Sequence, residues 1–165
     1  MGERRATQEA RRAREFKAFV AGAAGRLLHA ATLLTAEPRD DNPRARGLLT
    51  RALAHTYASW DRLHGEDPYD SARRQLALRF QRAAWHEYGG LGRPRPAPDS
   101  VLARLTPQER LVLVLRLYEG VAEEQTAALL GLSGERVRAI CARAMTTLLH
   151  PPSGPATARV EVAPS

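Results

Sequence analysis

The stretch that decides the fold is residues 105–149, LTPQERLVLVLRLYEGVAEEQTAALLGLSGERVRAICARAMTTLL. It opens with a capping-box pattern, because Thr106 stands at the N-cap, Pro107 at the first helical position and Glu109 at the third. The residues that follow are apolar on nearly every side, up to the helix stop at Gly120. The pattern therefore predicts a helix that begins at Pro107 and is almost entirely buried.

Two further helices are predicted downstream, a short one over residues 123–130 and a longer one that ends near residue 149. The turn Gly131-Leu132-Ser133 separates them, and Ser133 can cap the second helix. Two helices joined by a turn that contains glycine are typical of a helix-turn-helix. An ordinary helical hairpin has the same pattern, so the pattern alone leaves both interpretations open.

The first half of the chain is also expected to be helical, since Ala, Leu and Arg are abundant and β-branched residues are sparse. Apolar residues recur at helical spacing over residues 7–35, 43–63 and 68–88, with a proline near the start of the second and third segments. A short helix is expected over residues 99–104. The predicted fold class is therefore all-α.

The expected organisation is two small helical domains, residues 1–88 and 99–150, joined by a linker. The linker is residues 89–98, GGLGRPRPAP. This segment is rich in Gly and Pro and has no apolar period, which is typical of a linker. The tail over residues 151–165 is rich in Pro, Ala and Ser, and we expect it to be disordered.

Composition excludes several classes of protein. The 165 residues contain 25 basic and 18 acidic side chains, for a net charge of +7, which is compatible with a polyanionic partner. No uninterrupted apolar run reaches the roughly 18 residues of a membrane-spanning helix, and the charged N-terminus lacks the apolar core of a secretory signal. The single cysteine, Cys141, excludes an intramolecular disulfide and a cysteine-based zinc site.

The sequence also offers no catalytic constellation. The five histidines have no ligand spacing with each other or with Cys141, and no phosphate loop or nucleophile elbow is present. Cys141 falls on the predicted core face of its helix, where an inert thiol is expected. We therefore expect a protein that is not an enzyme and that needs no metal or cofactor.

The last helix has a face suited to DNA. At 100° per residue, the sector expected to face the core holds Val137, Ile140, Cys141, Ala144 and Leu148, and the opposite sector holds Glu135, Ala139, Ala142 and Thr146. Arg136 and Arg143 lie on one flank and Arg138 on the other. Small residues in the centre and arginines on the edges allow a helix to enter a major groove closely. A merely solvated arginine face is the alternative interpretation.

The 105–149 stretch resembles region 4 of extracytoplasmic-function (group 4) sigma factors of bacterial RNA polymerase, and most of all the sigma-E group of actinobacteria. The resemblance rests on Pro107, residues 112–116, Tyr118-Glu119, residues 127–130, Gly131 and Ser133. It implies a helix-turn-helix that binds a -35-type element in double-stranded promoter DNA. The candidate DNA contacts are Ser133, Glu135, Arg136, Arg138, Ala139, Ala142 and Arg143.

The first half resembles region 2 of the same family more weakly, through residues 15–20, 33–35 and 52–57 with Trp60. The resemblance implies that a later segment binds the melted -10 strand, with Arg73, Arg74, Arg79, Arg82 and Trp85 as candidates. Basic and aromatic side chains together suit single-stranded DNA. Phe80, on the apolar face, is expected in the core instead.

The segment that would face polymerase departs from the family pattern. Where the family carries acids, residues 42–48 read NPRARGL, so Arg44 and Arg46 stand there, although Asp40 and Asp41 come just before. A basic surface there would oppose contact with a partner that suits acids. The alternative function is therefore a DNA-binding regulator or protein-interaction module without initiation activity.

The resemblance also implies a cytoplasmic protein without membrane insertion, whose partners are promoter DNA, core RNA polymerase and an anti-sigma factor. The net charge of the chain does not by itself indicate DNA binding. Residues 1–92 hold 16 basic and 11 acidic side chains, whereas residues 107–149 hold five of each. The indication comes from three arginines on one helix and from the 45-residue pattern.

Overall fold

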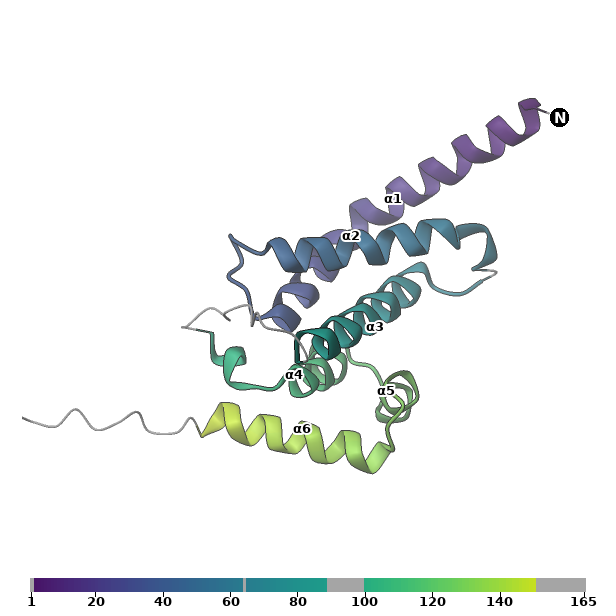
Figure 1. Ribbon diagram of the computed structural model, residues 1–165. Coiled ribbons are helices and arrows are strands. Elements are labelled where there is room, and N and C mark those ends of the chain that lie inside the picture. The colour runs from purple at the N-terminus through teal and green to yellow at the C-terminus, as the bar shows by residue number, and fades with distance from the viewer. Residues whose placement is uncertain (1, 64, 89–99, 151–165) are drawn as a thin grey trace, which may run out of the picture.

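Helices account for most of the described residues (2–63, 65–88 and 100–150), and no strand occurs among them, so the all-α prediction is confirmed in this computed structural model (Figure 1). The elements are α1 (Gly2–Thr35), α2 (Pro43–Ala58), the 3-10 turn η1 (Trp60–Arg62), α3 (Pro68–Tyr88), the 3-10 turn η2 (Val101–Arg104), α4 (Pro107–Leu113), the π turn η3 (Val114–Tyr118), α5 (Glu123–Leu130) and α6 (Gly134–Leu149). The predicted linker, residues 89–98, and the predicted disordered tail, residues 151–165, lie outside the described residues.

Four elements differ from the prediction. The short helix expected over residues 99–104 is a 3-10 turn over Val101–Arg104 in the described residues. The first helix begins at Gly2 rather than near residue 7, because its early residues are mostly strong helix formers that need no apolar face. The second ends at Ala58 and continues as a 3-10 turn, where the Ser59 amide donates to the carbonyls of both His55 and Thr56. The fourth becomes a π turn after Leu113, so that the Glu119 amide donates to Val114 O.

The caps predicted for the helix-turn-helix are present. Thr106 Oγ1 accepts from the Glu109 amide at 3.2 Å, and Glu109 Oε2 accepts from the Thr106 amide at 2.9 Å. Ser133 Oγ accepts from the Arg136 amide at 3.1 Å. Gly131 ends α5 in the left-handed region, at φ 68°, where a residue without a Cβ is favoured. Local sequence signals therefore fix the start of α4, the end of α5 and the start of α6.

The core runs through both halves of the chain, which we call the first block (residues 2–88) and the second block (residues 100–150). A single cluster of buried apolar side chains includes Leu34 of α1, Leu76 and Phe80 of α3, Leu111 of α4 and Ile140 of α6. Across the same contact, the buried Arg110 Nε donates to Leu34 O at 2.8 Å. The two-domain division stays a prediction about how each block would fold alone, because here the blocks share one core.

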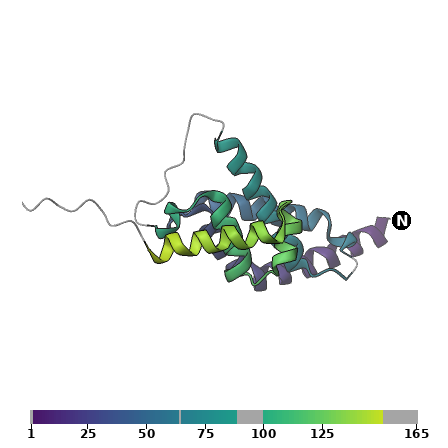
Figure 2. The ribbon, with the colours of Figure 1, turned by 90° about the horizontal axis from the view of Figure 1, so that it is seen from below.

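The two views place α6 on the side of the molecule opposite α2, with α4 between α3 and α6 (Figures 1 and 2). The N-terminal part of α1 extends past the end of α2, and its residues up to Arg11 are exposed. By length and composition alone, α1 could cross a membrane, and 39% of its apolar 18-residue window is buried inside the fold.

Candidate nucleic-acid interface

Helix α6 turns its apolar sector inward and its predicted DNA-contacting face outward. Val137, Ile140 and Ala144 are buried, and α6 packs on α4 and α5. All seven candidate contacts are exposed to solvent: Ser133, Glu135, Arg136, Arg138, Ala139, Ala142 and Arg143. Cys141 is partly buried, and burial raises the pKa of its thiol, which therefore stays protonated near neutral pH. The outer face of α6 is thus exposed, with alanines along its middle and charged side chains around them.

The three arginines of this face differ in what they contact. Within the described part of the chain, the Arg136 guanidinium has neither an ion pair nor a hydrogen bond. Arg138 Nη2 lies 2.7 Å from Glu123 Oε1 at the start of α5, and both side chains are accessible to water. The pair is bidentate, because Arg138 Nε also donates to Glu123 Oε2 at 3.2 Å, so a phosphate at Arg138 would have to replace two hydrogen bonds.

Arg143 holds α6 to the capped start of α4. Its Nε donates to Glu109 Oε1 at 2.7 Å, while the other oxygen of that carboxylate accepts the Thr106 amide. Burial pushes the pKa of Glu109 up, but the hydrogen bonds from Arg143 and Thr106 outweigh it and leave that pKa below its usual range. Arg143 therefore has a structural partner, which sequence reasoning missed because α4–α6 packing leaves no local signal.

The candidate contacts for single-stranded DNA lie along α3, and two of them form ion pairs within the protein. Arg73 pairs with Asp70 at 2.8 Å, and Arg74 lies 3.7 Å from Glu66. Arg82 is exposed, and Trp85 is 79% exposed, which is high for so large an apolar side chain. Arg79 is half-buried, and its Nε has no hydrogen-bond partner within the described chain. Phe80 is buried, as expected for a core residue.

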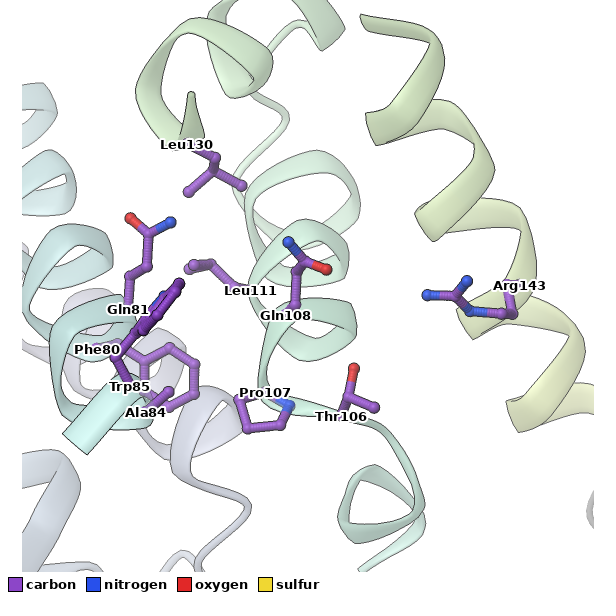
Figure 3. A pocket seen from close by; sticks show the side chains of 10 residues that line it. All are labelled: Phe80, Gln81, Ala84, Trp85, Thr106, Pro107, Gln108, Leu111, Leu130 and Arg143. Atoms are coloured by element: carbon purple, nitrogen blue, oxygen red, sulfur yellow. The ribbon is translucent and has the colours of Figure 1, made fainter. Parts of the chain in front are cut away.

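A groove of about 440 Å³ separates the end of α3 from the start of α4 (Figure 3). Trp85 and Pro107 line it from the two sides, Leu111 and Phe80 lie deeper, and Arg143 lies across α4 from the α3 residues. The groove thus has Trp85, a candidate contact for single-stranded DNA, on one side and Arg143, a candidate contact for double-stranded DNA, on the other.

The start of α2 is basic and capped from outside the helix. Glu37 accepts the Arg44 amide at 3.0 Å and the Ala45 amide at 2.8 Å, a cap that sequence reasoning did not find. Arg46 Nε donates to Asn42 Oδ1 at 3.0 Å, and Asp40 and Asp41 are exposed just before the helix. No acidic residue lies in the first turn of α2.

A second contact that the sequence did not indicate surrounds Glu119, whose side chain is 1% exposed. Both of its oxygens accept from Tyr69 Oη, and guanidiniums from Arg26 and Arg73 lie close by. Only Arg73 among these was a candidate site residue. In residues 2–63, 65–88 and 100–150, no cluster of three or more His, Cys, Asp or Glu side chains could hold a metal ion.

Comparison with known proteins agrees with this geometry. The family description "Sigma-70, region 4" matches residues 101–150, which are η2 through the end of α6. The chain is 30% identical over 152 residues to an RNA polymerase sigma-E factor of Streptomyces coelicolor, an alignment that covers 81% of this chain and 84% of that protein. The chain belongs to the sigma-E family of RNA polymerase sigma factors.

A second relative of this sigma-E family member, from Streptomyces avermitilis, is 29% identical over 152 residues, or 81% of this chain and 83% of that protein. A third, from Streptomyces antibioticus, is 28% identical over a stretch of the same length. No solved structure matches the chain significantly. The alignments extend well beyond region 4, so they include most of the first block as well.

Proposed function

We propose that this chain is a transcription initiation factor whose second block binds a -35-type element in double-stranded promoter DNA. The observation that carries the proposal is the outer face of α6, where every candidate contact is exposed within the segment that matches region 4. Family membership supports the same role. The first block would hold core RNA polymerase and the melted -10 strand.

The outer face of α6 has the shape and charge that major-groove binding needs. Ala139 and Ala142 add little bulk, so the helix can approach the base edges. Arg136 and Arg138, on opposite flanks, can reach phosphates or guanine edges on either side of the groove. Glu135 can accept a hydrogen bond from the amino group of a cytosine.

The first block has complementary chemistry for an unpaired strand. Arg82 and Trp85 are exposed on one end of α3, and Arg74 has a long, exposed ion pair with Glu66. Phosphate attraction and base stacking together suit single-stranded DNA. The protein would act in the cytoplasm, would have an anti-sigma partner and would have no enzymatic activity. Helix α1 would belong to the protein core and would not cross a membrane.

A run-off transcription assay tests the proposal. Purified core polymerase and the chain are combined on a promoter recovered by genomic pull-down. Transcripts that require the chain are the expected result. Binding of the promoter by the chain alone, with neither association with core polymerase nor a transcript, would refute initiation activity.

The basic start of α2 favours a second candidate function, a DNA-binding regulator that does not direct initiation. Arg44 and Arg46 stand where the family pattern has acids, and the acids nearby, Glu37, Asp40 and Asp41, come before the helix rather than in its first turn. Co-sedimentation of the chain with core polymerase distinguishes the candidates. The regulator would bind DNA but would not sediment with polymerase.

A further inference from the structure

The positive charge of the chain is concentrated on α2 and on most of α3, the helix that packs against it. Residues 43–58 contain three arginines and residues 71–86 contain four, and neither stretch contains an Asp or a Glu. The remaining 18 basic side chains are balanced by the 18 acidic ones. The whole net charge of +7 therefore comes from these two stretches, and a surface of this kind attracts polyanions.

On α2, the charged side chains stand at the edges of an outer face made of small residues. The inner face is buried and consists of Ala45, Leu48, Leu49, Ala52 and Thr56. At 100° per residue, the opposite sector holds Gly47, Thr50, Ala54 and Ala58. Arg51 lies on one edge of this sector and Arg46 on the other, and both are exposed. Helix α6 has the same arrangement, with small residues in the middle and arginines on both flanks.

Both edge arginines keep their charge available to a ligand. Within the described residues, Arg51 forms no ion pair or hydrogen bond, and its Nη2 atom lies 3.2 Å from the point where a Cβ on Gly47 would stand. The Arg51 side chain thus runs along the outer face rather than away from it. Arg46 Nε donates to the neutral Asn42 side chain at 3.0 Å, so no carboxylate offsets its charge in that bond. The exposed acids at residues 40–41 precede the helix and oppose a polyanion only at its N-terminal end.

This face suits double-stranded DNA better than it suits another protein. Protein interfaces depend on aromatic or large apolar anchors, and the larger side chains beside the face, Leu53 and Tyr57, are half-buried against α1. A duplex needs no such anchor, because its phosphates attract basic side chains. Small residues let a helix approach the base edges in a major groove, and arginines on both flanks can reach the phosphates that line the groove.

We propose that the outer face of α2 is a second surface for double-stranded DNA, with Arg46 and Arg51 as phosphate contacts. Helix α2 lies on the side of the molecule opposite α6 (Figures 1 and 2). One chain can therefore hold two duplexes at once, one on each side, and bridge them. The bridge rests on the proposed contact between α6 and duplex DNA, whereas the α2 surface itself needs neither that contact nor RNA polymerase.

Fluorescence anisotropy with a short labelled duplex of unrelated sequence tests the α2 surface. The full chain carries Arg136→Ala in every sample, so that α6 contributes less to binding. Adding Arg46→Gln and Arg51→Gln should weaken binding roughly tenfold or more at about 0.1 M salt, and should reduce the slope of log affinity against log salt by about two units, one for each lost phosphate contact. Arg4→Gln with Arg5→Gln removes the same charge from the exposed start of α1 and should leave both quantities unchanged. Circular dichroism establishes whether each variant remains helical.

A bridging assay measures the two surfaces together. A biotinylated promoter duplex is fixed to beads, and retention of a labelled duplex of unrelated sequence is measured. The wild-type chain should retain the labelled duplex. Arg46→Gln with Arg51→Gln should still bind the promoter duplex through α6 but should lose most of the labelled duplex, whereas the control with Arg4→Gln and Arg5→Gln should retain it.

Three results would overturn the α2 surface. The first is an equal salt slope for the α2 double variant and for its control, when both proteins are folded. The second is bridging that survives the α2 substitutions, which would mean that a second copy of the chain holds the second duplex. The third is unchanged duplex affinity together with lost binding to polyglutamate, which would assign the face to an acidic protein. A failure of the proposed function differs from all three, since it is a missing transcript in the presence of core polymerase.

Discussion

At the level of single residues, the three arginines on the outer face of α6 differ in their partners. Arg136 is free of ion pairs within the described chain, Arg138 shares an exposed pair with Glu123, and Arg143 is bound to the buried Glu109. Helical periodicity predicted that these three arginines lie on the exposed face of α6. Their partners were not predictable, because Glu109 is 34 residues from Arg143 and only α4–α6 packing joins them.

Replacing Arg136 with alanine should weaken binding to promoter duplex without changing stability. The loss of one phosphate contact should also reduce the slope of log affinity against log salt by about one unit. Anisotropy titrations at several salt concentrations measure both. Arg104→Ala removes an exposed arginine from η2 of the same block and serves as the control. A slope equal to that of the control would mean that Arg136 makes no DNA contact.

Replacing Arg143 with alanine should instead lower stability, by about 1 kcal/mol, because the buried Glu109 oxygen loses its donor. Thermal unfolding at pH 7 measures the change. A variant as stable as wild type would show that the Arg143–Glu109 bond contributes nothing to the fold.

The pH dependence of stability should depend on Glu109. Its folded pKa is depressed, so its contribution is present above the unfolded value of about 4.3 and is lost as pH falls through the folded value. In Arg143→Ala, burial is no longer offset by that arginine, and the loss should begin at higher pH. Urea unfolding between pH 7 and pH 3 compares the two proteins. Superimposable pH profiles would contradict the assignment.

At the scale of elements, the local sequence predicted helix starts and stops well where a cap or glycine marks them. The Thr106 capping box, the Ser133 cap and the Gly131 stop are all present. The π turn at Val114–Tyr118 had no such signal. The π turn adds a residue to the helical turn just before Glu119, whose side chain is buried against the first block. Because the sequence did not indicate the π turn, it did not indicate the contact between Glu119 and Tyr69 either.

Removing the hydroxyl of the α4 cap tests this element directly. Thr106→Ala should destabilise the chain by about 1 kcal/mol, because the Glu109 amide loses its acceptor. Thr50→Ala is the control, since Thr50 Oγ1 only donates to the Arg46 carbonyl on an exposed helical surface. Equal unfolding midpoints for the two variants would show that the cap is not a stability determinant.

At the scale of the whole molecule, the two blocks that the sequence separates pack on a common core. Helix periodicity indicated which side chains are buried, including Leu76 and Phe80, but it could not say that Leu111 of the other block would lie against them. Buried apolar faces are not directional, so periodicity identifies a face without identifying its partner. The candidate DNA helix and the basic start of α2 end on opposite sides of this core.

The buried Arg110 tests the contact between the blocks. Arg110→Met should cost about 1–3 kcal/mol, because the carbonyls of Leu34 and Leu105 lose a buried donor. Hydrogen exchange should show reduced protection in α1 as well as in α4. Faster exchange confined to the second block would contradict a shared core.

The chain should direct initiation through the outer face of α6. Run-off transcription with core polymerase on the chain's own promoter, comparing wild type with Arg136→Ala and Arg104→Ala, tests it most directly. A defined transcript should appear that requires the chain, falls with Arg136→Ala and is unchanged with Arg104→Ala. Specific promoter binding with no transcript and no bound polymerase would contradict it.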